Sequence, residues 1–375
     1  MDTRSFLDIL KAGSLAFTWG NALMIIVGLV LIYLAIVKEY EPVLLLPIGF
    51  GCILANLGMA ASADGEGFLS VLYRAGIQSE LFPLLIFVGV GGMIDFSPLL
   101  AQPHLALLGA AGQFGIYGTL MLATLIGFNL NEAASIGVIG AIDGPTAIYV
   151  AGKLAPGMLA PIAVAAYSYM SLVPIIQPPV MKLLTTRKER LIRMEYAPKP
   201  ISKKALIIFP IAVTIVISLL APTAAPLIAA LMLGNLLKES GVVDRLNKSA
   251  QNEIINISTL FLGLTIGGTM TAASFLNWNT LIILGLGLLA FILDTAAGVL
   301  FGKFMSLITG GKINPLIGAC GISAFPMAGR LSAKMAQDED FENFILMHAM
   351  GSNTAGQLAS VIAGGLLLTL VLAMH

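Results

Sequence analysis

Residues 131–152 read NEAASIGVIGAIDGPTAIYVAG, an apolar stretch long enough to cross a lipid bilayer that carries a carboxylate, a glycine and a proline near its centre. A charged side chain such as Asp143 is costly in an apolar segment and is therefore a candidate functional residue. Gly144 permits unusual backbone angles, and Pro145 removes a backbone donor and so leaves a carbonyl free. This stretch predicts a membrane helix that is broken around Asp143.

The whole chain has the composition of a membrane protein. Of its 375 residues, 58% are hydrophobic and 11% are charged, whereas soluble domains carry about 25% charged residues. We therefore expect an all-α polytopic membrane protein in a lipid bilayer. The zero net charge argues against a nucleic-acid partner. The two cysteines and three histidines are too scattered for a disulfide framework or a histidine metal site.

Apolar segments of about spanning length recur along the chain. They lie near 21–37, 43–61, 80–99, 104–128, 131–152, 157–184, 205–221, 223–237, 258–276, 280–303, 311–330 and 343–373. The sequence thus predicts four regions. An N-terminal amphipathic segment at 1–20 precedes a first transmembrane half at 21–184, and a basic loop at 185–204 joins it to a second transmembrane half at 205–375. Because the loop is rich in lysine and arginine, we expect it to be cytoplasmic, either as a plain connector or as a docking site for a soluble partner.

The two predicted halves carry an internal repeat. Ile136–Gly140 with Pro145 and Ala147 matches Ile317–Gly321 with Pro326 and Ala328 in order and spacing. Glycine pairs also recur, at 91–92 and 267–268. Such repeats are typical of secondary transporters, which place their ion site where two broken segments meet. The even number of segments between the copies favours parallel repeats, and one re-entrant or missed segment would make them inverted.

The two breaks carry different polar groups. Asp143 with the hydroxyl of Thr146 and the free carbonyls predicts an oxygen cage for a small hard cation; the alternative is a buried helix cap. In the second break, Asn314 and Ser323 offer neutral oxygens, and Arg330 offers a fixed positive charge that matches a carboxylate. The structural alternatives are a helix cap for Asn314, a back-bonded helix hydroxyl for Ser323 and a snorkelling side chain for Arg330.

Two further polar groups interrupt apolar segments. Asn353 lies among small residues in His348–Gly356 and is either an ion ligand or a hydrogen-bonding contact between helices. Tyr167 and Tyr169 lie too deep in their segment for the aromatic belt. They are expected to donate protons or line a pocket, with ordinary packing as the alternative.

Together these motifs resemble a known family. The runs at 140–148 (GAIDGPTAI), at 314–330 (NPLIG followed by GISAFPMAGR) and at 348–356 (HAMGSNTAG) are similar to the β subunit of the sodium-translocating decarboxylases. That family includes the membrane subunits of the oxaloacetate, methylmalonyl-CoA and glutaconyl-CoA decarboxylases. The resemblance covers most of the chain and is specific because three separated motifs agree in order and spacing.

The resemblance implies an activity. A β subunit of this family takes carboxybiotin from a partner subunit, releases CO2, exports Na+ and consumes a proton. The implied sodium ligands are Asp143, Asn314, Ser323 and Asn353. The implied carboxybiotin contacts are Arg330, Asn314 and Gly318. The implied catalytic residues are Asp143, Ser323, Arg330, Tyr167 and Tyr169. The implied partners are a biotin carrier, a carboxyltransferase and a small membrane subunit, in an oligomeric complex of the bacterial cytoplasmic membrane. The family also implies inverted repeats.

The sequence departs from the family pattern at Ala141-Ile142, Ala319-Cys320 and Ser352, which with the compact length favours the acyl-CoA branch over the oxaloacetate branch. The main alternative function is a sodium-coupled secondary transporter, such as a sodium/proton antiporter, without decarboxylase chemistry. A non-catalytic membrane anchor is a third possibility, but an anchor gains nothing from polar groups at mid-membrane.

Overall fold

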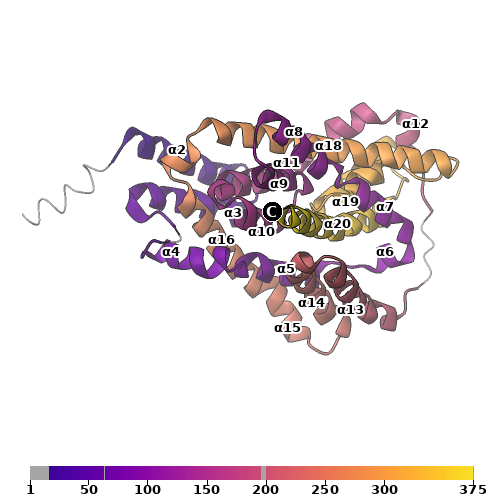
Figure 1. Cartoon of the computed structure of the whole chain (residues 1–375). Helices are drawn as coiled ribbons and strands as arrows, with labels where there is room; N and C mark the ends of the chain where they lie inside the picture. The colour runs from indigo at the N-terminus through magenta and orange to yellow at the C-terminus, as the bar shows by residue number, and fades with distance from the viewer. Residues whose placement is uncertain (1–16, 63, 196–199, 375) are drawn as a thin grey trace, which may run out of the picture.

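The computed structural model describes residues 17–62, 64–195 and 200–374, and its secondary structure there is helical (Figure 1). The first half contains α2 (Trp19–Val37), α3 (Pro42–Leu54), α4 (Phe68–Leu72), α5 (Leu81–Met93), α6 (Ser97–Ala101), α7 (Ala106–Ala111), α8 (Phe114–Ile126), α9 (Leu130–Gly137), the 3-10 turn η4 (Val138–Ala141), α10 (Gly144–Leu154) and α11 (Leu159–Leu184). Apart from its last four residues, the expected amphipathic segment 1–20 lies outside the described residues.

The rest of the chain includes the short helix of the basic loop and the helices that follow it. It contains α12 (Arg187–Arg190), α13 (Lys203–Leu220), α14 (Ala225–Ser240), α15 (Asp244–Ser249), α16 (Ile255–Thr269), α17 (Ala272–Phe275), α18 (Trp278–Ile308), the 3-10 turn η8 (Pro315–Cys320), α19 (Met327–Glu339) and α20 (Leu346–Ala373). Figure 1 shows α20, from the C-terminal end of the chain, in the middle of the molecule near α10 and α19.

Helices of spanning length confirm the prediction of an all-α, multi-pass membrane protein. Within the described residues, seven helices are long and apolar enough to cross a bilayer, and the bent pair Phe68–Gln78 with Leu81–Met93 makes up to eight. The seven cover residues 19–37, 42–59, 103–126, 156–184, 203–220, 278–308 and 346–373. The last of these is one long helix, Leu346–Ala373.

The first predicted break is present, and local sequence explains it. Asn129 and Glu132 form a capping box that starts α9. The chain then tightens into η4 and turns at Ile142, which has a left-handed φ of 54°. Asp143 caps the N-terminus of α10, and Pro145 is tolerated in the first turn of that helix because its missing N–H needs no partner there.

The predicted apolar segment at 311–330 is not a continuous span. It contains the short turn η8, then residues 321–326 without regular helix, and then the start of α19. Pro315 and Pro326 lack the N–H that a continuous helix needs. In α19, Arg330, Lys334 and Asp338 recur every four residues and are exposed, so this helix has a polar outer face.

Glycines bring helices from the two halves into close contact. A Cβ atom at Gly91 of α5 would overlap the Leu231 carbonyl oxygen of α14, and one at Gly267 of α16 would overlap the Ile48 carbonyl oxygen of α3. Both glycines belong to the predicted repeat, and each packs against a helix from the other half. The repeat itself and its inverted orientation stay predictions.

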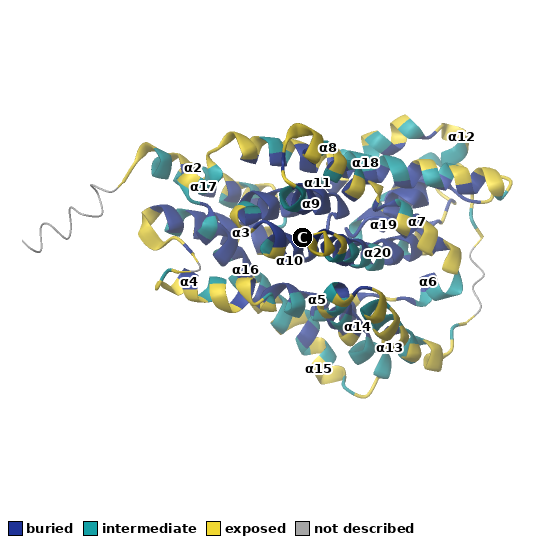
Figure 2. Cartoon of the chain, in the orientation of Figure 1, coloured by how far each residue is buried: buried dark blue, intermediate teal, exposed yellow. Residues whose placement is uncertain are grey.

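Burial separates an inner layer from an outer one (Figure 2). The middle of α20, α10 and the 3-10 turns η4 and η8 are largely buried, whereas α13 buries only Pro210 among its described contacts. An apolar helix with so little protein contact is expected to face lipid. The polar breaks therefore lie in the interior, surrounded by apolar helices.

Candidate functional site

Asp143 lies at the centre of the first break and is buried, with 3% of its surface exposed. Its Oδ1 accepts a hydrogen bond from the Thr146 backbone N–H at 3.2 Å, so the alternative role as a helix cap is confirmed. This bond uses only one of the two carboxylate oxygens. The cap therefore leaves the second carboxylate oxygen, Oδ2, available for contacts with other segments.

Two residues of α20 bind that second oxygen. Oδ2 of Asp143 accepts hydrogen bonds from Nε2 of Gln357 at 3.1 Å and from Oγ of Ser360 at 2.9 Å. Sequence reasoning missed both residues. The available signal was their spacing from Asn353, since positions 353, 357 and 360 fall on one face of a helix.

The second break lies directly against the first. The Ser323 backbone N–H donates to the Ala141 carbonyl oxygen at 3.2 Å. The Ser323 hydroxyl donates to the Ser360 hydroxyl, which in turn donates to Asp143. The structure therefore joins Ser323 and Asp143 through one bridging serine. Because Ser323 lies outside any helix, its structural alternative as a back-bonded helix hydroxyl is wrong.

A cavity of about 220 Å³ opens beside Asp143. Asp143, Tyr167, Ser323 and Gln357 contribute polar groups to its lining, together with Glu41, Asn256, Thr259 and apolar side chains. The Tyr167 hydroxyl is buried and has no hydrogen-bond partner among the described residues. Its oxygen would lie 2.7 Å from a Cβ at Gly144, so glycine is required for this close approach. Carboxylate, hydroxyl and amide oxygens are the ligands that small hard cations prefer.

The two tyrosines, predicted as a pair, point to different places. Tyr167 lines the cavity, whereas the Tyr169 hydroxyl donates to the Leu284 carbonyl oxygen of α18. Residues two apart on a helix do not share a face, so this separation follows from helix geometry. The structure therefore brings only Tyr167 to Asp143.

Asn353 holds the second break in place. Its Nδ2 donates to the carbonyl oxygens of Cys320 at 3.2 Å and Ile322 at 2.8 Å, and its Oδ1 accepts from the Gly329 N–H at 3.4 Å. Cys320 ends η8, and Ile322 lies in the irregular segment that follows it, so Asn353 binds the chain where the 3-10 turn gives way to irregular backbone. Asn353 does not line the Asp143 cavity.

Asn314, Gly318 and Arg330 also lie away from that cavity. Asn314 caps η8, as its structural alternative expects, by accepting from the Leu316 N–H at 3.1 Å. Its Nδ2 donates to the carbonyl oxygens of Arg190 and Ile192, both at 2.9 Å. Gly318 packs directly on the backbone of α18, and Arg330 is exposed without an ion pair to any described residue.

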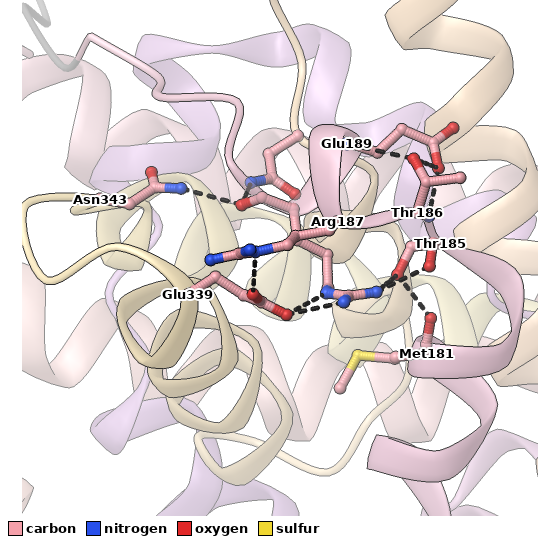
Figure 3. Close-up of polar contacts among 9 residues, drawn as sticks. Met181, Thr185, Thr186, Arg187, Glu189, Glu339 and Asn343 are labelled. Carbon is pink, nitrogen blue, oxygen red and sulfur yellow. Dashed lines mark hydrogen bonds and ion pairs between the residues drawn. The ribbon is translucent and has the colours of Figure 1, made fainter.

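A cluster of ion pairs fastens the basic loop to α19 (Figure 3). Arg187 and Arg190 pair with Glu339 at 3.2 and 2.6 Å, and Arg193 pairs with Asp340 at 2.7 Å. Figure 3 also shows Asn343 directed at the loop backbone, where its Nδ2 donates to the Arg190 carbonyl oxygen at 3.0 Å.

The same arginines stabilise the charged forms of their partners. The hydrogen bond from Arg190 holds the pKa of Glu339 below its ordinary value, and that from Arg193 does the same for the pKa of Asp340. Asn314 contacts the same loop, so the basic loop and the start of the second break are held together.

The chain is similar to known proteins over nearly its whole length. The family model described as the Na+-transporting oxaloacetate decarboxylase beta subunit matches residues 20–371. The chain is 55% identical to methylmalonyl-CoA decarboxylase subunit beta of Veillonella parvula over 96% of this chain and 95% of the relative. It is 54% identical to glutaconyl-CoA decarboxylase subunit beta of Acidaminococcus fermentans, with 97% and 96% covered. It is 47% identical to the oxaloacetate decarboxylase beta chain of Klebsiella pneumoniae, with 95% and 96% covered.

Proposed function

Because the chain belongs to the family of β subunits of the sodium-transporting decarboxylases, we propose that it releases CO2 from carboxybiotin on a partner subunit and exports Na+ in the same cycle. It is the membrane subunit of a sodium-pumping decarboxylase. The observation that carries the proposed cycle is the meeting of two helix breaks at one buried carboxylate, with Ser323 joined to Asp143 through Ser360. Broken helices that meet inside a membrane protein are a typical ion site.

In this proposal, Na+ binds in the cavity beside Asp143. The carboxylate balances the charge of the ion, and Ser323, Tyr167 and Gln357 offer neutral oxygens from three other segments. Asn314 and Asn353, which were also predicted as ligands, each hold one end of the second break. We propose that they act on sodium binding by fixing the position of Ser323.

Carboxybiotin is proposed to arrive from the cytoplasm, where the exposed guanidinium of Arg330 attracts its carboxylate. Asn314 and Gly318 would shape this binding region through η8, which precedes α19. In the reaction, the bond between the carboxyl carbon and the biotin nitrogen breaks, CO2 leaves, and the nitrogen takes a proton. Tyr167 and Asp143 are the proposed proton donors. Decarboxylation removes the negative charge of the carboxybiotin carboxylate and with it an attraction that favours the substrate-bound conformation. The conformational equilibrium therefore moves toward an outward-open state.

The proposed assembly contains a biotin carrier, a carboxyltransferase and a small membrane subunit, in an oligomeric complex of the bacterial cytoplasmic membrane. We propose a substrate of the acyl-CoA class, because identity to the two acyl-CoA relatives is 55% and 54%, against 47% for the oxaloacetate relative. The basic loop fastened to α19 is the proposed docking region for the soluble partners.

The test is Asp143→Asn in the purified complex, reconstituted into liposomes, with the exposed Asp244→Asn as the matched control. We expect Asp143→Asn to abolish both sodium-dependent decarboxylation and Na+ transport, and Asp244→Asn to leave both unchanged. Sodium-dependent decarboxylation that survives Asp143→Asn would contradict the site. Avidin separates the competing function: it should block Na+ transport by the pump, whereas a sodium/proton antiporter would be insensitive to it.

A further inference from the structure

A second carboxylate is buried in the membrane region. Asp294 lies within α18 and has 0% of its surface exposed. Among the described residues, Asp143 and Asp294 are the two buried carboxylates. The rule that singles out Asp143, a charge in the middle of an apolar segment, also applies to Asp294, which interrupts the run LGLLAFILDTAAGVL at 286–300.

Asp294 of α18 contacts two other segments, α8 at Gly115 and η4 at Gly140. Its Oδ1 accepts a hydrogen bond from the Gly115 N–H at the start of α8. Its Oδ2 faces η4, since a Cβ at Gly140 would lie 2.9 Å from this oxygen. Oδ2 is buried and has no hydrogen-bond partner among the described residues. Gly140 precedes Asp143 by three residues, so Asp294 contacts the backbone of the first break.

An ionised Asp294 would be poorly balanced here. The elements packed on α18 are η8, α11, α8, η4, α7 and α9. Their titratable side chains are Tyr117, Glu132, Tyr167, Tyr169, Lys182 and Cys320, and within the described residues none of them forms an ion pair or hydrogen bond with Asp294. One N–H at a helix N-terminus offsets only part of the cost of burying a negative charge. A bound proton removes that charge.

We propose that Asp294 is a second proton-binding carboxyl of the transport cycle, protonated in this conformation and sensitive to movement of the first break. The proton adds to Oδ2 from water and leaves to water, and no other bond changes. Any shift of η4 changes the surroundings of Oδ2, so the proton affinity of Asp294 differs between conformations of the break. This inference rests on the proposed function for its role in the cycle, but not for the protonation itself.

Infrared spectroscopy of the assembled complex tests the protonation directly. A protonated carboxyl gives a carbonyl band that shifts in D2O. We expect one such band at neutral pH to disappear in Asp294→Asn, a separate change in Asp143→Asn, and no change in the exposed control Asp244→Asn. Asparagine keeps the oxygen that accepts from Gly115, so a purely structural cap would be preserved. If Asp294→Asn retains every protonated-carboxyl band of the wild type, the proposal is overturned.

A second measurement keeps the proposal testable if Asp294→Asn fails to assemble into the complex. In Asp143→Asn, a remaining protonated-carboxyl band supports Asp294 as its source, and the absence of any such band overturns the proposal. Sodium titration distinguishes the two cations: a band of Asp294 that sodium removes would make it a sodium site and overturn the assignment to a proton.

The role in the cycle is read from proton uptake per CO2 released in proteoliposomes. We expect Asp294→Asn to lower this ratio while Asp244→Asn leaves it unchanged, and an unaltered ratio would overturn the role. If the wild-type complex shows no sodium-dependent decarboxylation, the proposed function fails, but the infrared band still decides the protonation of Asp294.

Discussion

Replacing Ser360 with alanine isolates the hydrogen bond that links the second break to Asp143. The Ser360 hydroxyl donates to Oδ2 of Asp143 at 2.9 Å and accepts from Ser323. The substitution removes one of the three hydrogen bonds to the carboxylate and leaves those from Thr146 and Gln357. It also breaks the connection between the two halves of the site, without introducing a charge or a larger side chain.

The size of the effect follows from the kind of bond. A hydrogen bond to a charged group contributes about 1.5–3 kcal/mol. The hydroxyl stabilises the ionised carboxylate, which is the form that binds a cation, whereas a proton competes for the same oxygens. Ser360→Ala should therefore weaken the apparent sodium affinity by about 10-fold to about 150-fold. The deficit should shrink as the pH rises, because fewer protons compete.

The assay is the sodium dependence of decarboxylation by the reconstituted complex. Ser360→Thr keeps a hydroxyl and should restore most of the affinity. Ser332→Ala is the matched control, since Ser332 is equally buried in α19 but contacts the Met181 sulfur instead of the site. If Ser360→Ala shows the same half-saturating sodium concentration as the wild type at every pH, the proposed role of the Ser323–Ser360–Asp143 connection is refuted.

Other contacts give further expected outcomes. If the Tyr167 hydroxyl donates the proton, Tyr167→Phe should lower the rate of decarboxylation by about 100-fold or more. Tyr169→Phe should retain turnover and lose only about 1 kcal/mol of stability. Equal turnover in the two variants would contradict the assignment of Tyr167 as proton donor. Asn353→Ala leaves the Cys320 and Ile322 carbonyls unpaired and should lower the free energy of unfolding by about 1–3 kcal/mol for each. Thermal unfolding in detergent measures this loss, and an unchanged midpoint would argue against the role of Asn353 in holding the second break. Because Arg190 lowers the pKa of Glu339 from its ordinary value of 4.5, their pairing stabilises the fold above that pH and is lost as the pH falls through the lower folded pKa. Glu339→Gln should abolish this part of the acid dependence of the unfolding temperature, and an unchanged profile would contradict the pairing.

Local chemistry was enough to predict part of this arrangement. Helix breaks follow from glycine and proline, whose effects on the backbone act within a few residues, so the break at Asp143 could be predicted. Glycine and proline also predicted the second break, at 314–330, but its stretch at 311–330 was expected to have spanning length and does not form a continuous span. Its apolar residues suggested a membrane helix, but the exposed Arg330 and Lys334 show that α19 has a polar outer face.

The amino-acid sequence by itself determined that the chain folds as membrane helices, that two of its segments are broken, and that Asp143 and Ser323 belong to those breaks, because apolar burial and backbone chemistry are local properties. Only the tertiary structure decided which side chains meet there. Gln357 and Ser360 lie 214 and 217 residues from Asp143, and Tyr167 rather than Tyr169 reaches the cavity. These contacts depend on how helix faces pack against one another, and a helical period in the sequence does not say which face meets which partner.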